Sequence, residues 1–507
     1  MCVNFILNAC LTVVYEKQYA MKTASLQPPK MARILAILTP EEFKSLGLWL
    51  QSPWANTNKK LVSLYTIVQK YHPDFSEKAM DKAQLFKKLY PTKAFDDKWM
   101  RNLMAAMCRQ VEQFLVHQRL ESDKILSAQL LGREYLERHE GDWHEKQVGE
   151  LINSLEAKKA KETEDFLLLA LLHSELYERP EHTQRKSSHA ALLTADHYLD
   201  CFYGLKKWRF ATEMNERQLI LPEGTPPTWN ISQLEHLTQH LEIPALRIYK
   251  ERLDLTQSTS MEGYLHLKNE VFTRFESLSV KDQQLLLFYL INTGIQLWLK
   301  GFVQIMGELL ELYKTGLKEG LLVYFDRLSE TTYSNIVTIG NSLQQFVFVR
   351  DFVNEYSDKL APEMQEDGRV WATAHAFFKQ QDFEESITLL STHSFTSHSF
   401  SLLGKILLME SYYEACKNDD SYFLFLLDFG EAFKKQIHRD QLLSEGRKAA
   451  YLNFVKYTTI LLKIRIEKKW DGKWLETFEE QINREEFMQG KQWIMGKLGE
   501  IKDGLPS

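Results

Sequence analysis

The stretch AFFKQQDFEESITLL, residues 376–390, decides the fold that we expect for this chain. Two apolar stripes with helical spacing lie on either side of a short polar run, residues 379–382. The stripes consist of Ala374, Phe377, Phe378, Phe383, Ile387 and Leu390. This pattern predicts two amphipathic helices joined by a tight turn, in which Phe383 packs on the first helix and the small Ser386 lets the helices approach closely. An ordinary hairpin in a globular bundle is the alternative to a repeating unit.

Aromatic residues at expected turns recur along the second half of the chain. They are Phe302, Phe346, Phe383 and Tyr422, at intervals of 44, 37 and 39 residues. Because a tetratricopeptide unit spans about 34 residues, these units have longer helices or looser joints. We therefore predict an all-α fold in which residues 231–440 form an α-α superhelix, a tetratricopeptide-like solenoid of helical hairpins.

Five longer stretches of the sequence match a known pattern. They are LTPEEFKSLGLWLQSPWANTNKKLVSLY, FDDKWMRNLM, LDCFYGLKKWRFATEMNERQLIL, ELYKTGLKEGLL and SNIVTIGNSLQQFVFVRDFVNEY, in this order. With the hairpin at 376–390, they resemble an uncharacterised family of bacterial tetratricopeptide-like helical-repeat proteins. Gln381 departs from the repeat pattern, which has glycine at this turn position. The resemblance implies the helical fold and a cytoplasmic bacterial setting, and it implies no activity.

Composition places the chain among folded helical proteins. Hydrophobic residues make up 44% and charged residues 26%, so a sizeable core is possible and disorder is not indicated. The net charge of −6 is unevenly distributed, because residues 31–130 carry 15 basic and 10 acidic side chains. A basic segment of this kind can meet nucleic acid, but an exposed surface rich in lysine is the commoner explanation.

Helix caps, proline and glycine predict five segments. They are residues 1–30, a mis-called or disordered N-terminal extension; 31–120, a helical head; 121–220, a helical middle segment; 231–440, the repeats; and 441–507, a capping helix with a helical tail. Met31 is the expected start. In the head, Thr39 and Glu42 predict a capping box, and Asp96 is expected to cap a long helix. The stretch LPEGTPPTWN, residues 221–230, is expected to be a hinge.

Sequence motifs for catalysis, cofactors or metals are not found. The patterns GxxxxGK[ST], GxSxG, GxGxxG and HExxH are absent. The five cysteines lack CxxC spacing, which favours a reducing cytoplasm over disulfides or a zinc site. His236 and His240 lie four residues apart, but without a third ligand a solvent-facing helix is the better interpretation. We therefore predict no enzyme activity, no cofactor and no metal. Since no apolar run reaches the length of a membrane span, we also predict no membrane partner.

The inner wall of the expected superhelix is the candidate binding surface, because the first helix of each hairpin lines it. In the best unit, Trp371, His375 and Lys379 share one helix face, where the indole supplies contact area and the ammonium group binds a carboxylate. The neighbouring units add Thr338, Asn341, Ser342, Glu410, Glu414 and Asn418. For Trp371, a core contact with the neighbouring unit is an equal alternative.

Two functions follow from these patterns. The first is a non-catalytic scaffold whose concave groove binds an unidentified peptide or protein segment, because the mixed charge of the row suits a polypeptide. Nucleic acid would demand net positive charge. The second is a nucleic-acid-linked regulator, in which residues 31–130 bind DNA or RNA and the acidic solenoid binds a partner.

Overall fold

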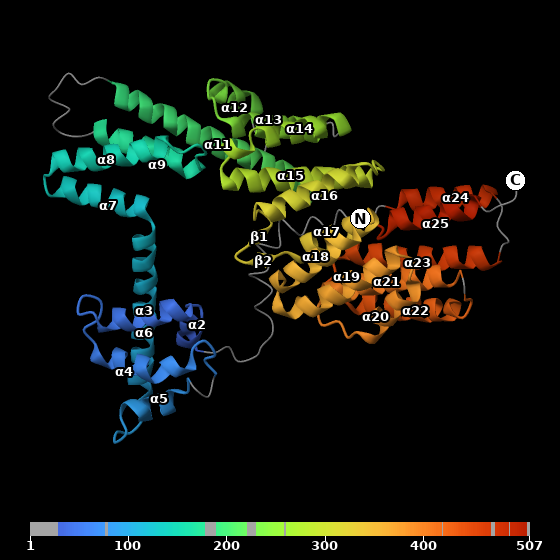
Figure 1. Cartoon of the computed structure of the whole chain (residues 1–507), viewed down its shortest axis with the longest axis horizontal. Helices are drawn as coiled ribbons and strands as arrows, with labels where there is room; N and C mark the ends of the chain where they lie inside the picture. The colour runs from blue at the N-terminus through green and yellow to red at the C-terminus, as the bar shows by residue number, and fades with distance from the viewer. Residues whose placement is uncertain are drawn as a thin grey trace. The chain divides into compact units, whose positions relative to one another are not determined.

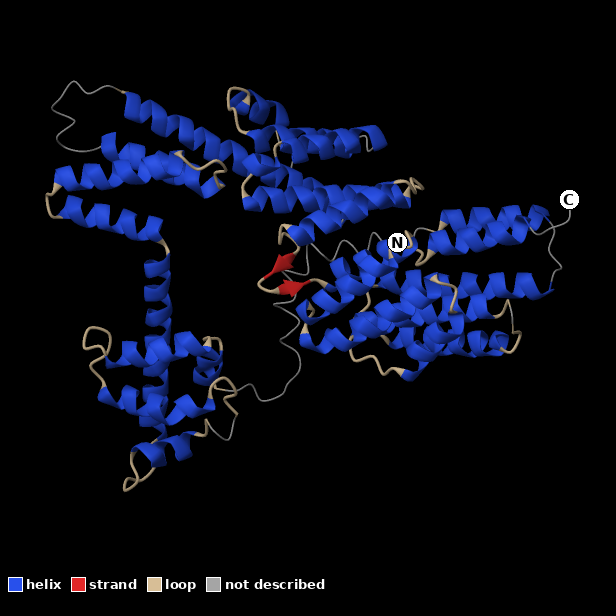
Figure 2. Ribbon diagram, viewed as in Figure 1, coloured by secondary structure: helices blue, strands red, loops and turns tan. Residues whose placement is uncertain are grey.

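The computed structural model describes residues 29–76, 80–177, 189–220, 230–257, 260–417, 419–467, 472–485 and 487–503. Helices dominate these ranges, and the strands within them are Val323–Tyr324 (β1) and Arg327–Leu328 (β2), which pair antiparallel (Figure 2). The predicted all-α class is therefore confirmed.

Contacts divide the chain into two units. Among the described residues, one unit contains Lys159–Ala170 and the residues from Leu193 onward, and the other contains the residues up to Lys158 together with Leu171–Leu192. We call them the C-terminal and N-terminal units. The helix α9, Thr163–Tyr177, contributes to both.

The N-terminal unit is built on one long helix. Its elements are α2 Lys30–Ala36, α3 Pro40–Gln51, α4 Lys59–Val68, the 3-10 helix η1 Gln69–Tyr71, α5 Lys82–Leu89, α6 Asp97–Ser122, α7 Lys124–Glu137 and α8 Gly141–Glu156. Helix α6 contacts α2, α3, α4 and α5 (Figure 1). Their buried apolar side chains form one cluster. Met31 is 1% exposed within this cluster, whereas residues 1–28 of the expected extension lie outside the described residues.

Both predicted helix caps of this unit are confirmed. The Thr39 hydroxyl accepts a hydrogen bond from the Glu42 amide, and the Glu42 carboxylate accepts one from the Thr39 amide at 2.8 Å. The Asp96 carboxylate accepts from the Trp99 amide at 2.9 Å, at the start of α6. These bonds satisfy amides that have no partner within the helix, so local sequence fixes where each helix begins.

The C-terminal unit contains the region of the predicted repeats. Its elements are α11 Ala190–Ile220, α12 Ile231–Thr238, α13 Pro244–Gln257, α14 Met261–Thr273, η2 Phe275–Ser277, α15 Val280–Leu299, α16 Ile305–Lys318, α17 Glu330–Ser342, α18 Phe346–Tyr356, η3 Ser357–Lys359, η4 Pro362–Met364, α19 Gln365–Lys379, α20 Phe383–Thr392, α21 His398–Ala415, α22 Tyr422–Arg439, α23 Glu445–Glu467, α24 Gly472–Arg484 and α25 Lys491–Asp503. Residues 221–229 of the expected hinge lie outside the described residues.

Successive helices from α15 to α22 pair as hairpins. Helix α15 contacts α16, α17 contacts α18, α19 contacts α20, and α21 contacts α22. The aromatic residues expected at turns lie at these joints, since Phe346, Phe383 and Tyr422 each begin the second helix of a pair. The first helices also contact one another in order, α17 with α19, α19 with α21, and α21 with α23 (Figure 1).

The hairpin of residues 376–390 has the predicted form. Gln381 adopts a φ of 69° at the turn, the left-handed conformation in which the repeat pattern has glycine. Phe383 packs edge-on against Phe378 with ring centroids 5.6 Å apart, as expected for the return of the second helix. Ser386 is fully buried, and its hydroxyl lies 3.1 Å from that of Ser411 on α21. This residue therefore also joins its hairpin to the next one.

Candidate functional site

The first helices of four successive hairpins surround a small recess of about 140 Å³. We call it the inner recess, and its lining consists of Ile295, Trp298, Ser334, Asn335, Thr338, Ile339, Trp371, His375, Leu403, Ile406, Leu407, Glu410 and Gln489. Helices α15, α17, α19 and α21 supply all of these except Gln489, which precedes α25. Thr338, Trp371, His375 and Glu410, all predicted site residues, therefore meet at one place.

Trp371 belongs to the core as well as to the recess. It is 3% exposed, and its ring lies 5.9 Å from that of Phe400 on the next hairpin and 5.4 Å from that of His375. Of the two alternatives that the sequence leaves open for this residue, the core contact with the neighbouring unit is the one found. Its indole is thus a fixed wall of the recess rather than an exposed anchor.

His375 is held as a neutral imidazole. The Asn341 amide nitrogen donates to its Nδ1 at 3.1 Å, so the ring proton resides on Nε2. Burial, together with the positive charge of Lys379, lowers the pKa of His375 to about 3. The imidazole therefore brings no positive charge to the recess at physiological pH. Asn341 is itself buried and serves to orient this ring.

Glu410 is the acidic group of the recess. Burial raises the pKa of its carboxyl to about 7, partly opposed by the positive charge of Lys379. Lys379 is half-buried, and its ammonium group lies 5.7 Å from the ring centroid of Phe378. A carboxyl that titrates near neutral pH inside a recess is a common mark of a functional position, although structural groups also show it.

Glu414, one helical turn beyond Glu410, is already neutralised. Its carboxylate pairs with Lys417 at 2.7 Å and with Lys497 of α25 at 2.7 Å, and it is 4% exposed. Glu414 therefore ties the C-terminal tail to α21. Of the remaining predicted residues, Ser342 is half-buried at the end of α17, and Asn418 lies outside the described residues.

The C-terminal tail covers part of the surface that the first helices form. The Gln492 side chain donates to the Trp298 carbonyl oxygen at 2.9 Å, and the Trp493 ring packs edge-on against Tyr413 at 5.2 Å. Sequence reasoning missed Trp298 and Gln489 as lining residues. Trp298 lies on the first helix of a hairpin, so the spacing argument used for α19 would have found it. Gln489 reaches the recess through tertiary packing alone.

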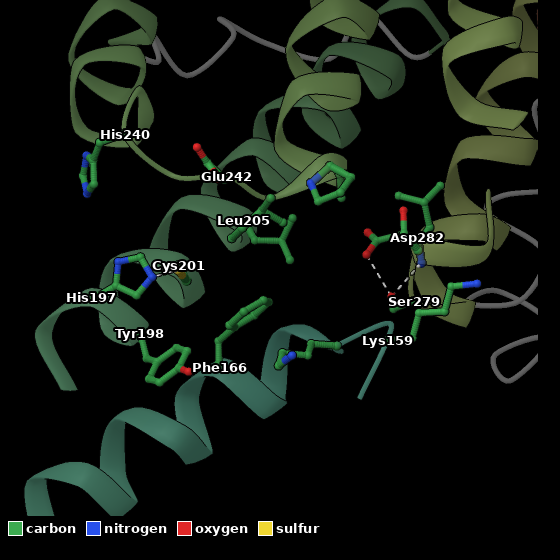
Figure 3. A pocket seen from close by; sticks show the side chains of 16 residues that line it. Lys159, Phe166, His197, Tyr198, Cys201, Leu205, His240, Glu242, Ser279 and Asp282 are labelled. Carbon is green, nitrogen blue, oxygen red and sulfur yellow. Dashed lines mark hydrogen bonds between the residues drawn. The ribbon is translucent and has the colours of Figure 1, made fainter. Parts of the chain in front are cut away.

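A second recess, of about 460 Å³, lies at α11 (Figure 3). His197, Tyr198 and Cys201 of α11 stand on one side, and Ser279 and Asp282 at the start of α15 on the other. The remaining lining residues are Lys159, Lys161, Phe166, Leu205, His240, Glu242, Ile243, Pro244, Ala245, Ser277 and Leu278.

The buried carboxylate of this second recess is bound to other protein groups, and its thiol is protonated. Asp282 is 1% exposed, and its Oδ1 accepts hydrogen bonds from Arg209 at 2.6 and 2.9 Å and from Tyr249 at 2.5 Å. Burial raises the pKa of the Cys201 thiol to about 11, so it is protonated at neutral pH and is a weak nucleophile. This chemistry is that of a structural network, and it makes the α11 recess a weaker candidate than the inner recess.

Other histidines have structural partners or face solvent. His393, which follows α20, bonds Asp367 of α19, and His398, which begins α21, bonds Asp440 after α22, each at 2.7 Å. His236 is exposed on α12, in agreement with the solvent-facing interpretation. Within the described ranges, no group of three or more His, Cys, Asp or Glu side chains is placed to hold a metal ion.

No protein-family model, curated protein or solved structure matches the chain. The resemblance to a bacterial helical-repeat family therefore stays a prediction. In the part of the chain that the structure describes, no helix combines the length and apolar character that a membrane crossing requires.

Proposed function

We propose that the hairpins from α15 to α23 form a solenoid that acts as a non-catalytic scaffold and binds an extended segment of a partner protein along its first helices. The inner recess is the observation that carries this proposal. It brings together side chains from four successive first helices, as a site for an extended ligand requires. Its mixture of indole, hydroxyl, amide and carboxyl groups suits a polypeptide, which offers both donors and acceptors along its length.

The chemistry of the described side chains favours binding over catalysis. Burial raises the pKa of the thiols of Cys201 and Cys416 to about 11, and it also raises that of Cys108. His375, whose pKa is about 3, is too weak a base to accept a proton at neutral pH. In keeping with the family resemblance, we place this scaffold in the bacterial cytoplasm.

A blocking variant tests the scaffold. Thr338 lies at the inner recess and is half-buried, so Thr338→Trp places a large side chain there without removing a core residue. Thr388→Trp is the matched control, because Thr388 is exposed on the second helix α20. Peptides selected from a random library against the full chain should lose at least about tenfold in affinity with Thr338→Trp and keep their affinity with Thr388→Trp. The proposal fails if no peptide is selected or if both variants bind alike.

One observation favours the nucleic-acid alternative. In the N-terminal unit the ammonium groups of Lys60 and Lys93 lie 4.5 and 4.9 Å from the ring centroid of Tyr90. Lys70 and Lys88 approach Tyr71 in the same way, at 5.1 and 5.4 Å. Such basic and aromatic clusters suit backbone phosphates and unstacked bases.

Binding of a fluorescent oligonucleotide to the full chain, measured at two salt concentrations, decides this alternative. Affinity that falls steeply with salt and is lost in Lys88→Glu supports it. If the oligonucleotide does not bind at low salt, the nucleic-acid alternative is ruled out.

A further inference from the structure

Within the described residues, the charge of Glu410 is not balanced by a direct partner. Among the described residues, Lys379, Glu414 and Lys497 influence its carboxyl through space, without a hydrogen bond. Lys497 is already engaged, since its ammonium group lies 2.7 Å from Glu414 and 2.5 Å from Glu500. Glu410 therefore differs from Glu414 on the same helix face, which has two cationic partners.

The rest of the inner recess offers no competing cation. His375 is the basic residue of the lining, and it is neutral because its Nδ1 accepts from Asn341 and its ring is buried. The recess thus presents one acidic group and no positive charge of its own at neutral pH.

Two indoles complete the walls. Trp298 and Trp371 both line the recess, and Trp371 is fixed against Phe400. The face of an indole carries partial negative charge, and tryptophan is the side chain that attracts a cation most strongly. The volume of about 140 Å³ accommodates the end of one side chain but not a folded segment.

We propose that the inner recess holds the cationic end group of a lysine or arginine side chain from the partner segment, with Glu410 as its counter-ion and Trp298 and Trp371 as its aromatic walls. This inference rests on the proposed scaffold function and names one feature of the partner. A bound cation stabilises the ionised carboxylate of Glu410, because it supplies a direct ion pair that none of the described residues supplies.

Small probes test the recess in the full chain without a known partner. Binding of n-butylammonium, n-propylguanidinium, n-butanol and n-butyrate is followed by ligand-detected NMR at constant ionic strength and pH 8. We expect at least one of the two cations to bind at least about tenfold more tightly than n-butanol or n-butyrate. Glu410→Gln should remove that preference and leave the affinity for n-butanol unchanged. Equal binding of all four probes, or a preference that survives in Glu410→Gln, overturns the inference.

Two further measurements test the cation site without depending on the stability of Glu410→Gln. Between pH 8 and pH 5.5 the cation affinity should fall about thirtyfold in the unmodified chain, since Glu410, with a pKa of about 7, becomes protonated. Trp298→Leu should lower the affinity for the cations more than the affinity for n-butanol. Trp298→Phe should lower the affinity for the cations less than Trp298→Leu does. A pH-independent affinity overturns the inference.

The random-peptide selection separates this inference from the scaffold proposal. The selected peptides could lose binding to Thr338→Trp and yet show no enrichment in lysine or arginine. That outcome would overturn the cation site alone. A selection that yields no binding peptide would overturn the scaffold function instead.

Discussion

Replacing Glu410 by glutamine should make the C-terminal unit more stable at pH 8 and leave its stability unchanged at pH 4. Burial raises the pKa of Glu410 from 4.5 to about 7, so folding favours the protonated carboxyl. The unmodified chain therefore loses stability as the pH rises from about 4.5 to about 7, and above pH 7 the loss is complete. That difference in pKa corresponds to about 3 kcal/mol. Because the side chain is half-buried and not sealed from water, we expect about 2 kcal/mol.

Amide hydrogen exchange measures this difference where it arises. A chain of 507 residues is not expected to unfold in one step, so the free energy of opening is read from peptides that cover α21, His398–Ala415. At pH 8 these amides should exchange more slowly in Glu410→Gln, and at pH 4, below the unfolded pKa of the carboxyl, the two proteins should match. Glu385→Gln, at an exposed position of α20, is the control and should change the opening free energy by less than about 0.5 kcal/mol. The same difference at both pH values, or a less stable variant at pH 8, would refute the reasoning.

Two further substitutions test the packing of the C-terminal unit. Asp282→Ala leaves the buried guanidinium of Arg209, 6% exposed, without its acceptor, and should cost about 3–5 kcal/mol in the free energy of opening around α15. A loss below about 1 kcal/mol, read by amide exchange from peptides that cover α15, would contradict the buried pair. Gly340→Ala places a Cβ 2.5 Å from Cγ2 of Val349 and should cost about 1–3 kcal/mol. Gly307→Ala is the control, because its Cβ meets nothing within 4 Å, and it should be neutral or stabilising. Equal melting temperatures for the two alanine variants would show that α17 and α18 are not in close contact.

Some features of the turn and of the recess could be predicted only in part. The position of Phe383 just after the turn was enough to predict that it packs on the first helix, because both helices belong to one hairpin. The sequence also showed that Gln381 replaces a glycine, but not that its backbone would adopt a positive φ, since glutamine rarely does so. Trp371 and Lys379 have the same helical periodicity, yet one is in the core and the other is half-buried. The next hairpin contributes to this difference, because Phe400 of α21 packs against the indole with ring centroids 5.9 Å apart.

The sequence by itself determined the helices, their caps and their pairing as hairpins, because these depend on neighbours within a few residues, on apolar spacing and on residues such as Thr39 and Asp96. Only the tertiary structure decided which charges remain available. Glu410 and Glu414 are indistinguishable as a pair of glutamates one turn apart, and Lys497, which neutralises Glu414, is more than eighty residues away. Direct ion pairing acts over a few ångströms. The position of α25 therefore leaves one carboxyl paired and the other facing the recess.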